Sequence, residues 1–121
     1  MKKLLLILLC LPMIGFGQQT YVPDDNFEQA LINLGYDNVL DDYVTTANIN
    51  TVDTLILMSL NIVDLTGIED FTALNSLICE GNQLTTLDVS NNAALIHLRC
   101  GLNQLTTLDV SQNLALKFLK A

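Results

Sequence analysis

The stretch NQLTTLDVS at residues 82–90 occurs a second time, without change, at residues 103–111. The step of 21 residues between the two copies also relates Cys79 to Cys100. A less regular unit precedes them at a step of 22 and begins at Val52. A fixed period of 20–30 residues is typical of a solenoid, in which each unit buries its apolar edge against its neighbours.

The pattern within a unit is LNSLICEGNQL at residues 74–84 and LIHLRCGLNQL at residues 95–105. Both fit L-x-x-L-x-L-x-x-N-x-L, with cysteine in place of the third leucine. This pattern resembles the leucine-rich repeat, and the resemblance covers residues 52–121. Within the upstream unit, LNIVDLTGIEDF (60–71) resembles the internalin type, although Leu60 stands where the asparagine should be. The resemblance implies an α/β solenoid with parallel β-strands and a short irregular or strand-like convex side.

The two halves of each unit differ in what they predict. Alternation through Leu77, Ile78 and Cys79 places the first and third side chains on one face, as a β-strand requires. Asn82 and Asn103 fall at sharp turns, where an amide can bond the backbone of its own loop and of the next, so we assign both a structural role. The other half, LTTLDVSNNAAL, has a similar spacing and allows a second sheet. Because the outward residues vary only in the cysteine-bearing half, we expect that half to face the ligand.

Residues 21–34, YVPDDNFEQALINL, predict a helix ahead of the repeats. Asp24 and Asp25 follow a proline in a capping position, apolar residues recur at helical spacing, and Gly35 ends the pattern. Residues 21–37 resemble the N-terminal caps of secreted leucine-rich repeat proteins of Bacteroidetes-type bacteria. An amphipathic helix here would cover the otherwise bare end of the apolar core. We therefore expect a leader at residues 1–17, a helical cap region at 18–51, and about three repeat turns at 52–121, the last incomplete.

The first 17 residues, MKKLLLILLCLPMIGFG, have the layout of a secretory signal peptide. Lys2 and Lys3 precede an apolar run too short for a membrane span, which needs about 20 residues. Gly15 and Gly17 are small residues suited to a cleavage site. Cys10 leaves a lipoprotein anchor as a less favoured interpretation. Cleavage near Gly17 predicts a secreted or cell-surface protein without stable membrane insertion afterwards.

Charge and composition narrow the functional classes. Loss of Lys2 and Lys3 with the leader takes the formal net charge from −8 to −10. Nucleic acid is therefore excluded as a partner, since its binding depends on Lys and Arg contacts to phosphates. No phosphate loop, nucleophile elbow or calcium loop is present, and the single histidine, His97, cannot form an imidazole cluster for zinc. We expect no enzymatic activity, no cofactor and no metal.

Cys79 and Cys100 occupy the inward-facing third-leucine position on neighbouring turns, so their backbones should lie about 5 Å apart. Buried thiols acting as small hydrophobic side chains are the favoured interpretation. A disulfide stays open in an oxidising compartment, although side chains stacked in register fit its dihedral poorly. Two thiols alone make a poor metal site.

Residues 115–121, ALKFLKA, begin a further unit and stop at the position that cysteine occupies in the preceding units. A solenoid that ends within a strand exposes an apolar edge and unpaired backbone groups. Two interpretations compete: the chain is the front of a longer protein, or, if it ends at Ala121, this edge pairs end to end with another copy.

The outward residues of the predicted strands form three columns across the turns. They combine apolar, aromatic and charged groups, which suits protein recognition on a rigid sheet. The candidate binding residues are Ile56, Met58, Ser76, Ile78, Glu80, His97, Arg99, Phe118 and Lys120. The family resemblance implies an exported module that binds a protein or glycan partner. The alternatives are a solvent face without a ligand, a structural spacer, and the front of a longer surface protein whose activity lies downstream.

Overall fold

The computed structural model describes residues 17–121, so the leader prediction, with Cys10, falls almost entirely outside the described residues. The described chain forms two sheets, one antiparallel pair and one parallel sheet of four strands. The elements, in chain order, are β1 (Gln19–Tyr21), α2 (Asp25–Asn33), β2 (Tyr43–Thr45), the 3-10 turn η1 (Thr46–Asn48), β3 (Thr54–Ile56), the 3-10 turn η2 (Ile68–Asp70), β4 (Ser76–Ile78), β5 (His97–Arg99) and β6 (Phe118–Lys120).

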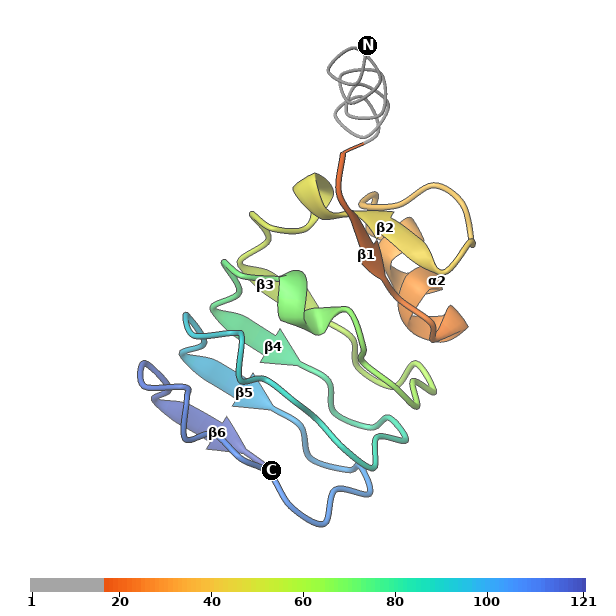
Figure 1. Cartoon of the computed structure of the whole chain (residues 1–121). Helices are drawn as coiled ribbons and strands as arrows, with labels where there is room; N and C mark the ends of the chain where they lie inside the picture. The colour runs from red at the N-terminus through yellow and green to blue at the C-terminus, as the bar shows by residue number, and fades with distance from the viewer. Residues whose placement is uncertain (1–16) are drawn as a thin grey trace, which may run out of the picture.

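The parallel sheet contains one strand from each repeat. Strands β3, β4, β5 and β6 lie side by side in chain order, with the N-terminal unit of β1, β2 and α2 beyond β3 (Figure 1). The register places Leu55 beside Leu77 and Leu77 beside Leu98. These central leucines are buried while their strand neighbours point outward, which is the alternation that a half-buried strand requires. The repeat steps of 21 and 22 therefore correspond to one strand position each.

The convex half of each turn contains no strand among the described residues 79–96 and 100–117, so of the two forms that the sequence left open, irregular or strand-like, the structure has the irregular one. Hydrogen bonds to side chains explain the difference. Asn92 donates its side-chain amide to the carbonyls of Ile68 and Phe71, and Asn113 donates to those of Val89 and Asn92. These amides link successive turns in place of a backbone ladder, as polar side chains do where they compete with regular structure.

Asn82 and Asn103 lie where the chain leaves the strands. Asn82 donates its side-chain amide to the carbonyl oxygens of Leu57 and Cys79, and its Oδ1 accepts from the backbone N–H groups of Leu60 and Ile62. The Asn103 side chain repeats part of this arrangement one turn later, donating to the carbonyls of its own turn and the preceding one. Each amide thus satisfies backbone groups that strand pairing leaves open.

Helix α2 is capped at both ends by residues that directly precede and follow it. Oδ1 of Asp24 accepts from the N–H groups of Asn26 and Phe27, which caps the N-terminus. At the C-terminus, Gly35 has a φ of +89° and donates to the carbonyl of Ile32, and Tyr36 donates to that of Leu31, which is a Schellman arrangement.

Contacts between the N-terminal unit and the first repeat join the two parts. Oδ2 of Asp24 accepts from the N–H groups of Val63 and Asp64 in the first repeat. The ring of Phe27 on α2 stacks on that of Phe71, with centroids 6.2 Å apart. Phe27 of α2 and Phe71 of the first repeat therefore belong to one apolar core cluster.

Strands β1 and β2 are an element that the sequence patterns did not predict. Thr20 pairs with Val44 in the antiparallel register, and the exposed rings of Tyr21 and Tyr43 lie 5.5 Å apart. The available signal was the occurrence of β-branched and aromatic residues in both short segments. Three-residue strands are too short to show a period, so this signal could not be told from that of a loop.

Candidate functional site

The outward face of the parallel sheet carries three columns of side chains. The central column runs Ile56, Ile78, Arg99, Lys120 from β3 to β6, and the register places each residue directly beside the next. A second column runs Thr54, Ser76, His97, Phe118 along the other side of it. The structure therefore brings the candidate binding residues of the strands together on one surface, which we call the strand face.

Exposure differs along the strand face. Ile56 is 57% exposed, Met58 45% and Phe118 62%, whereas Ser76, Ile78, His97 and Arg99 are half-buried. Large exposed apolar side chains at both ends of a rigid sheet are typical of a recognition surface. At the β6 end, the ring of His97 meets that of Phe118 edge to face at 5.8 Å, and Oγ of Ser76 lies 3.4 Å from Nδ1 of His97.

Glu80, which the sequence analysis placed among the outward residues, is buried. Its side chain is only 8% exposed because it lies between Arg99 and Lys120. Nη2 of Arg99 is 2.8 Å from Oε1 of Glu80, and Nζ of Lys120 is 3.5 Å from Oε2. A single carboxylate thus orients two cationic side chains of the next two turns. Glu80 therefore orients Arg99 and Lys120 on the strand face and exposes little of its own surface.

Lys117 is a residue of this surface that the column analysis missed. It lines a shallow hollow together with His97, Arg99, Phe118, Leu119 and Lys120. Since Arg99, Lys117 and Lys120 are the only cationic side chains in the described part of the chain, all of its positive charge gathers here. The signal was present in the sequence, because these three residues are the last basic ones and lie within one repeat step.

Cys79 and Cys100 are free and buried behind the strand face. Burial raises the pKa of the Cys79 thiol to about 12, and burial also raises the pKa of the Cys100 thiol. The proximity of the other thiol and of Glu80 disfavours the Cys79 thiolate further. Both side chains therefore stay protonated and act as small apolar groups in the column that begins with Leu57.

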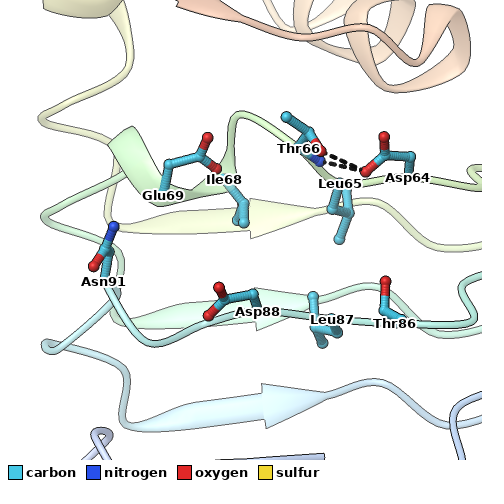
Figure 2. Close-up of a pocket in the computed structure, with 9 residues that line it drawn as sticks. All are labelled: Asp64, Leu65, Thr66, Ile68, Glu69, Thr86, Leu87, Asp88 and Asn91. Carbon is cyan, nitrogen blue, oxygen red and sulfur yellow. Dashed lines mark hydrogen bonds between the residues drawn. The ribbon is translucent and has the colours of Figure 1, made fainter.

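A second hollow, of about 300 Å³, lies in the convex layer and is lined by Asp64, Leu65, Thr66, Ile68, Glu69, Thr86, Leu87, Asp88 and Asn91 (Figure 2). Its three carboxylates are engaged locally. Asp64 accepts from the N–H and hydroxyl of Thr66, Glu69 accepts from the N–H of Gly67, and Asp88 accepts from Ser90. These are turn-forming contacts, which account for the acidic residues without a ligand.

Glu28 is the acidic residue with a strongly raised pKa. Its side chain is buried and accepts from the N–H groups of Asp41 and Asp42. Burial, together with the neighbouring carboxyl group of Asp37, raises its pKa to about 7, against the lowering effect of the two N–H donors. The contacts tie the 37–42 segment to α2, so the role visible here is structural.

Comparisons with known proteins agree with this architecture. No protein-family model matches the sequence. Internalin J of Listeria monocytogenes serotype 4b (strain F2365) is 37% identical over 72 residues, which are 60% of this chain and 8% of the internalin. The functional domain of internalin J, which includes a cysteine ladder, is 36% identical and has a TM-score of 0.74, covering 85% of this chain and 24% of that chain.

Two further solved internalins of Listeria monocytogenes are similar in fold. InlF is 25% identical with a TM-score of 0.75, over 82% of this chain and 30% of that one. InlC2 is 23% identical with a TM-score of 0.75, over 85% of this chain and 48% of that one. The chain therefore has an internalin-like leucine-rich repeat fold and spans less than half the length of each of these relatives. Within residues 17–121, no helix has the length and apolar character needed to cross a membrane.

Proposed function

We propose that this chain is an exported, non-enzymatic interaction module that binds a protein or glycan partner through the strand face. The observation that carries the proposal is the composition of that face. Exposed Ile56, Met58 and Phe118 share one rigid surface with Arg99 and Lys120. Aromatic and arginine side chains on a preorganised surface contribute much of the energy of protein recognition. The likeness to internalin J and its functional domain supports this class of function.

The proposal also assigns a role to each of three segments of the chain. Residues 1–17 act as a cleaved signal peptide that delivers the protein to the cell surface or the medium. Residues 18–51 cap the solenoid, and residues 52–121 form the repeats that present the strand face. Burial of Phe27 against Phe71 supports the capping role, since it removes the end of the core from water.

A capture experiment tests the module. The purified mature chain is immobilised, and surface extracts of cells that share its environment are passed over it. Ile78→Ser and Arg99→Gln should each reduce capture of a bound partner by at least about tenfold, the effect of losing about 1.4 kcal/mol of binding. Val63→Ser is the matched control, because Val63 is an exposed aliphatic residue outside the strand face. Capture that is unchanged by both strand-face variants would show that this surface does not bind.

The second candidate is a spacer, or the front of a longer surface protein whose activity lies downstream. The observation that favours it is the short span of the chain, which covers 8% of internalin J. The intact mass of the native exported protein distinguishes the two. A mass near that of residues 18–121 supports the free module, for which end-to-end self-association through β6 is then examined by sedimentation. A much larger mass supports the front of a longer protein.

A further inference from the structure

The central column of the strand face changes chemistry halfway across the sheet. From β3 to β6 it reads Ile56, Ile78, Arg99, Lys120, with each residue beside the next in the parallel register. Met58 and Leu60, both exposed, extend the apolar half near β3. Lys117 and Phe118 extend the cationic half near β6. The face therefore has an apolar end and a cationic end.

The cationic half is organised by the buried Glu80. Its carboxylate contacts Nη2 of Arg99 at 2.8 Å and Nζ of Lys120 at 3.5 Å, which restricts both long side chains. The one carboxylate of Glu80 pairs with Arg99 and Lys120, and Lys117 adds a third cation, so this half has a net positive charge. In a chain whose residues after Gly17 carry a net charge of −10, such a gathering of every cation indicates a negatively charged counterpart.

The spacing of the column sets the size of that counterpart. Ile56 and Lys120 are three strand positions apart, which corresponds to about 14 Å at about 4.8 Å for each step. An extended peptide rises about 3.3 Å per residue, so about five residues reach from one end of the column to the other. Aliphatic side chains over Ile56 and Ile78 would bury apolar area, while carboxylates would meet Arg99 and Lys120.

We propose that the strand face binds a short extended segment of a partner protein, with aliphatic side chains at one end and acidic side chains at the other, lying across the strands. The aliphatic end sits over β3 and β4, and the acidic end over β5 and β6. This inference rests on the proposed function, because it names the partner chemistry of the same surface. It goes further in assigning the sign of the partner's charge and the direction in which the segment lies.

Labelled synthetic peptides test the assignment by fluorescence anisotropy on the mature chain. The probe is an extended peptide with a leucine pair and an aspartate pair about five residues apart. Two comparison peptides keep its length: one has asparagine for aspartate, and the other alternates the same leucines and aspartates. We expect the probe to bind at least about tenfold more tightly than either comparison peptide. We also expect its affinity to fall as sodium chloride is raised, since exposed ion pairs are screened by salt.

Variants locate the binding. Lys120→Gln and Lys117→Gln should weaken the probe severalfold and leave the asparagine peptide unaffected, whereas Ile56→Ser should weaken both peptides. Thr106→Glu is the matched control for net charge, because it makes the same change of one unit at an exposed position on the convex side. Circular dichroism of each variant checks that the fold is retained.

Three results would overturn the inference. They are absence of measurable probe binding, equal affinity for the aspartate and asparagine peptides, and preference for an acidic oligosaccharide such as polygalacturonate over the probe. The proposed function has a separate readout. A partner whose capture depends on Ile78 but is insensitive to Lys117→Gln and Lys120→Gln would refute the acidic segment and leave the interaction module in place. Loss of both readouts would refute the two together.

Discussion

Glu28 and Glu80 show how differently a buried carboxylate can be accommodated. Glu80 lies under two cations of the following turns, so its charge is compensated. Within residues 17–121 no ion pair involves Glu28, and the carboxyl groups of Asp25, Asp37, Asp41 and Asp42 lie close by. The N–H groups of Asp41 and Asp42 are its hydrogen-bond donors. The protein therefore retains a proton on Glu28 up to a pH at which an exposed glutamate has lost it.

The raised pKa of Glu28 predicts a pH dependence of stability. The pKa is about 7 in the folded chain and 4.5 for an unperturbed glutamate, so the folded state binds the proton more tightly. This contribution is complete below about pH 4.5 and is lost as the pH rises through about 7. The free energy of unfolding should therefore fall between these values, by at most about 1.4 kcal/mol per pH unit.

Urea unfolding at several pH values measures this slope. Glu28→Gln keeps an oxygen acceptor for the N–H groups of Asp41 and Asp42 but cannot titrate, so its unfolding free energy should vary less over this range. Glu69→Gln is the control, because Glu69 accepts from Gly67 in the convex layer and the change leaves Glu28 in place. Parallel curves for the wild-type chain and Glu28→Gln would contradict the prediction.

Among the secondary-structure elements, the three-residue strands depend on the turns that follow them. Strands of this length have few ladder bonds, and each is followed by a segment whose backbone groups must find other partners. The side-chain amide of Asn82 donates to the carbonyls of Cys79 and Glu80 after β4. The same side chain bonds backbone groups of the preceding turn. Asn82 and Asn103 are consequently as important for the sheet as the strand residues themselves.

Replacement of Asn82 tests this dependence. Asn82→Ala removes the acceptor for Leu60 and Ile62 and the donor to Leu57 and Cys79, so several buried backbone groups lose their partners. Since each such loss costs about 1–3 kcal/mol, we expect an overall destabilisation of about 2–4 kcal/mol in urea unfolding. Gln83→Ala, at an exposed neighbouring position, should change the stability by less than about 0.5 kcal/mol. An equal effect of both substitutions would contradict the role of Asn82.

Across the whole molecule, the N-terminal unit and the repeats fold against each other as one body. The hydroxyl of Thr20 on β1 donates to Oδ2 of Asp70 in the first repeat at 2.7 Å. Gly67, in the same repeat, approaches β1 so closely that a Cβ there would lie 2.8 Å from the carbonyl oxygen of Tyr21 and from Cγ2 of Val22. Contacts of this kind couple the unfolding of the two parts.

Gly67→Ala should destabilise the entire chain. The φ of +110° disfavours a side chain, and the added methyl group would collide with β1, so we expect a loss of about 2–4 kcal/mol and a lower Tm for the single transition. Gly35→Ala, with φ of +89° but open space around it, should cost only about 1 kcal/mol. Gly101→Ala, with ordinary contact distances, should cost less still.

Thermal unfolding followed by far-UV circular dichroism measures all three glycine variants. A Gly67→Ala protein that melts in two separate steps would show that the N-terminal unit is independent of the repeats. A melting curve equal to that of Gly101→Ala would contradict the close approach to β1.

Much of this architecture can be predicted from the sequence because the repeat sets which residues become neighbours. Each strand meets its neighbour one step of 21 or 22 residues away, and these steps place Leu55 beside Leu77 and Leu77 beside Leu98. The helix was also predictable, since its capping aspartate and terminal glycine lie within its own segment. In both cases, the interactions that decide the structure join residues at a regular and recognisable spacing.

Other features of the structure depend on contacts that cannot be predicted from the repeat spacing. The burial of Glu80 depends on Arg99 and Lys120, which come from the next two turns. The pairing of β1 with β2 joins segments on either side of α2, and the irregular convex layer results from amides that bond across turns in place of a ladder. A repeat sequence specifies which positions recur, but the charge and exposure of each position depend on the side chains that the folded turns bring above and below it.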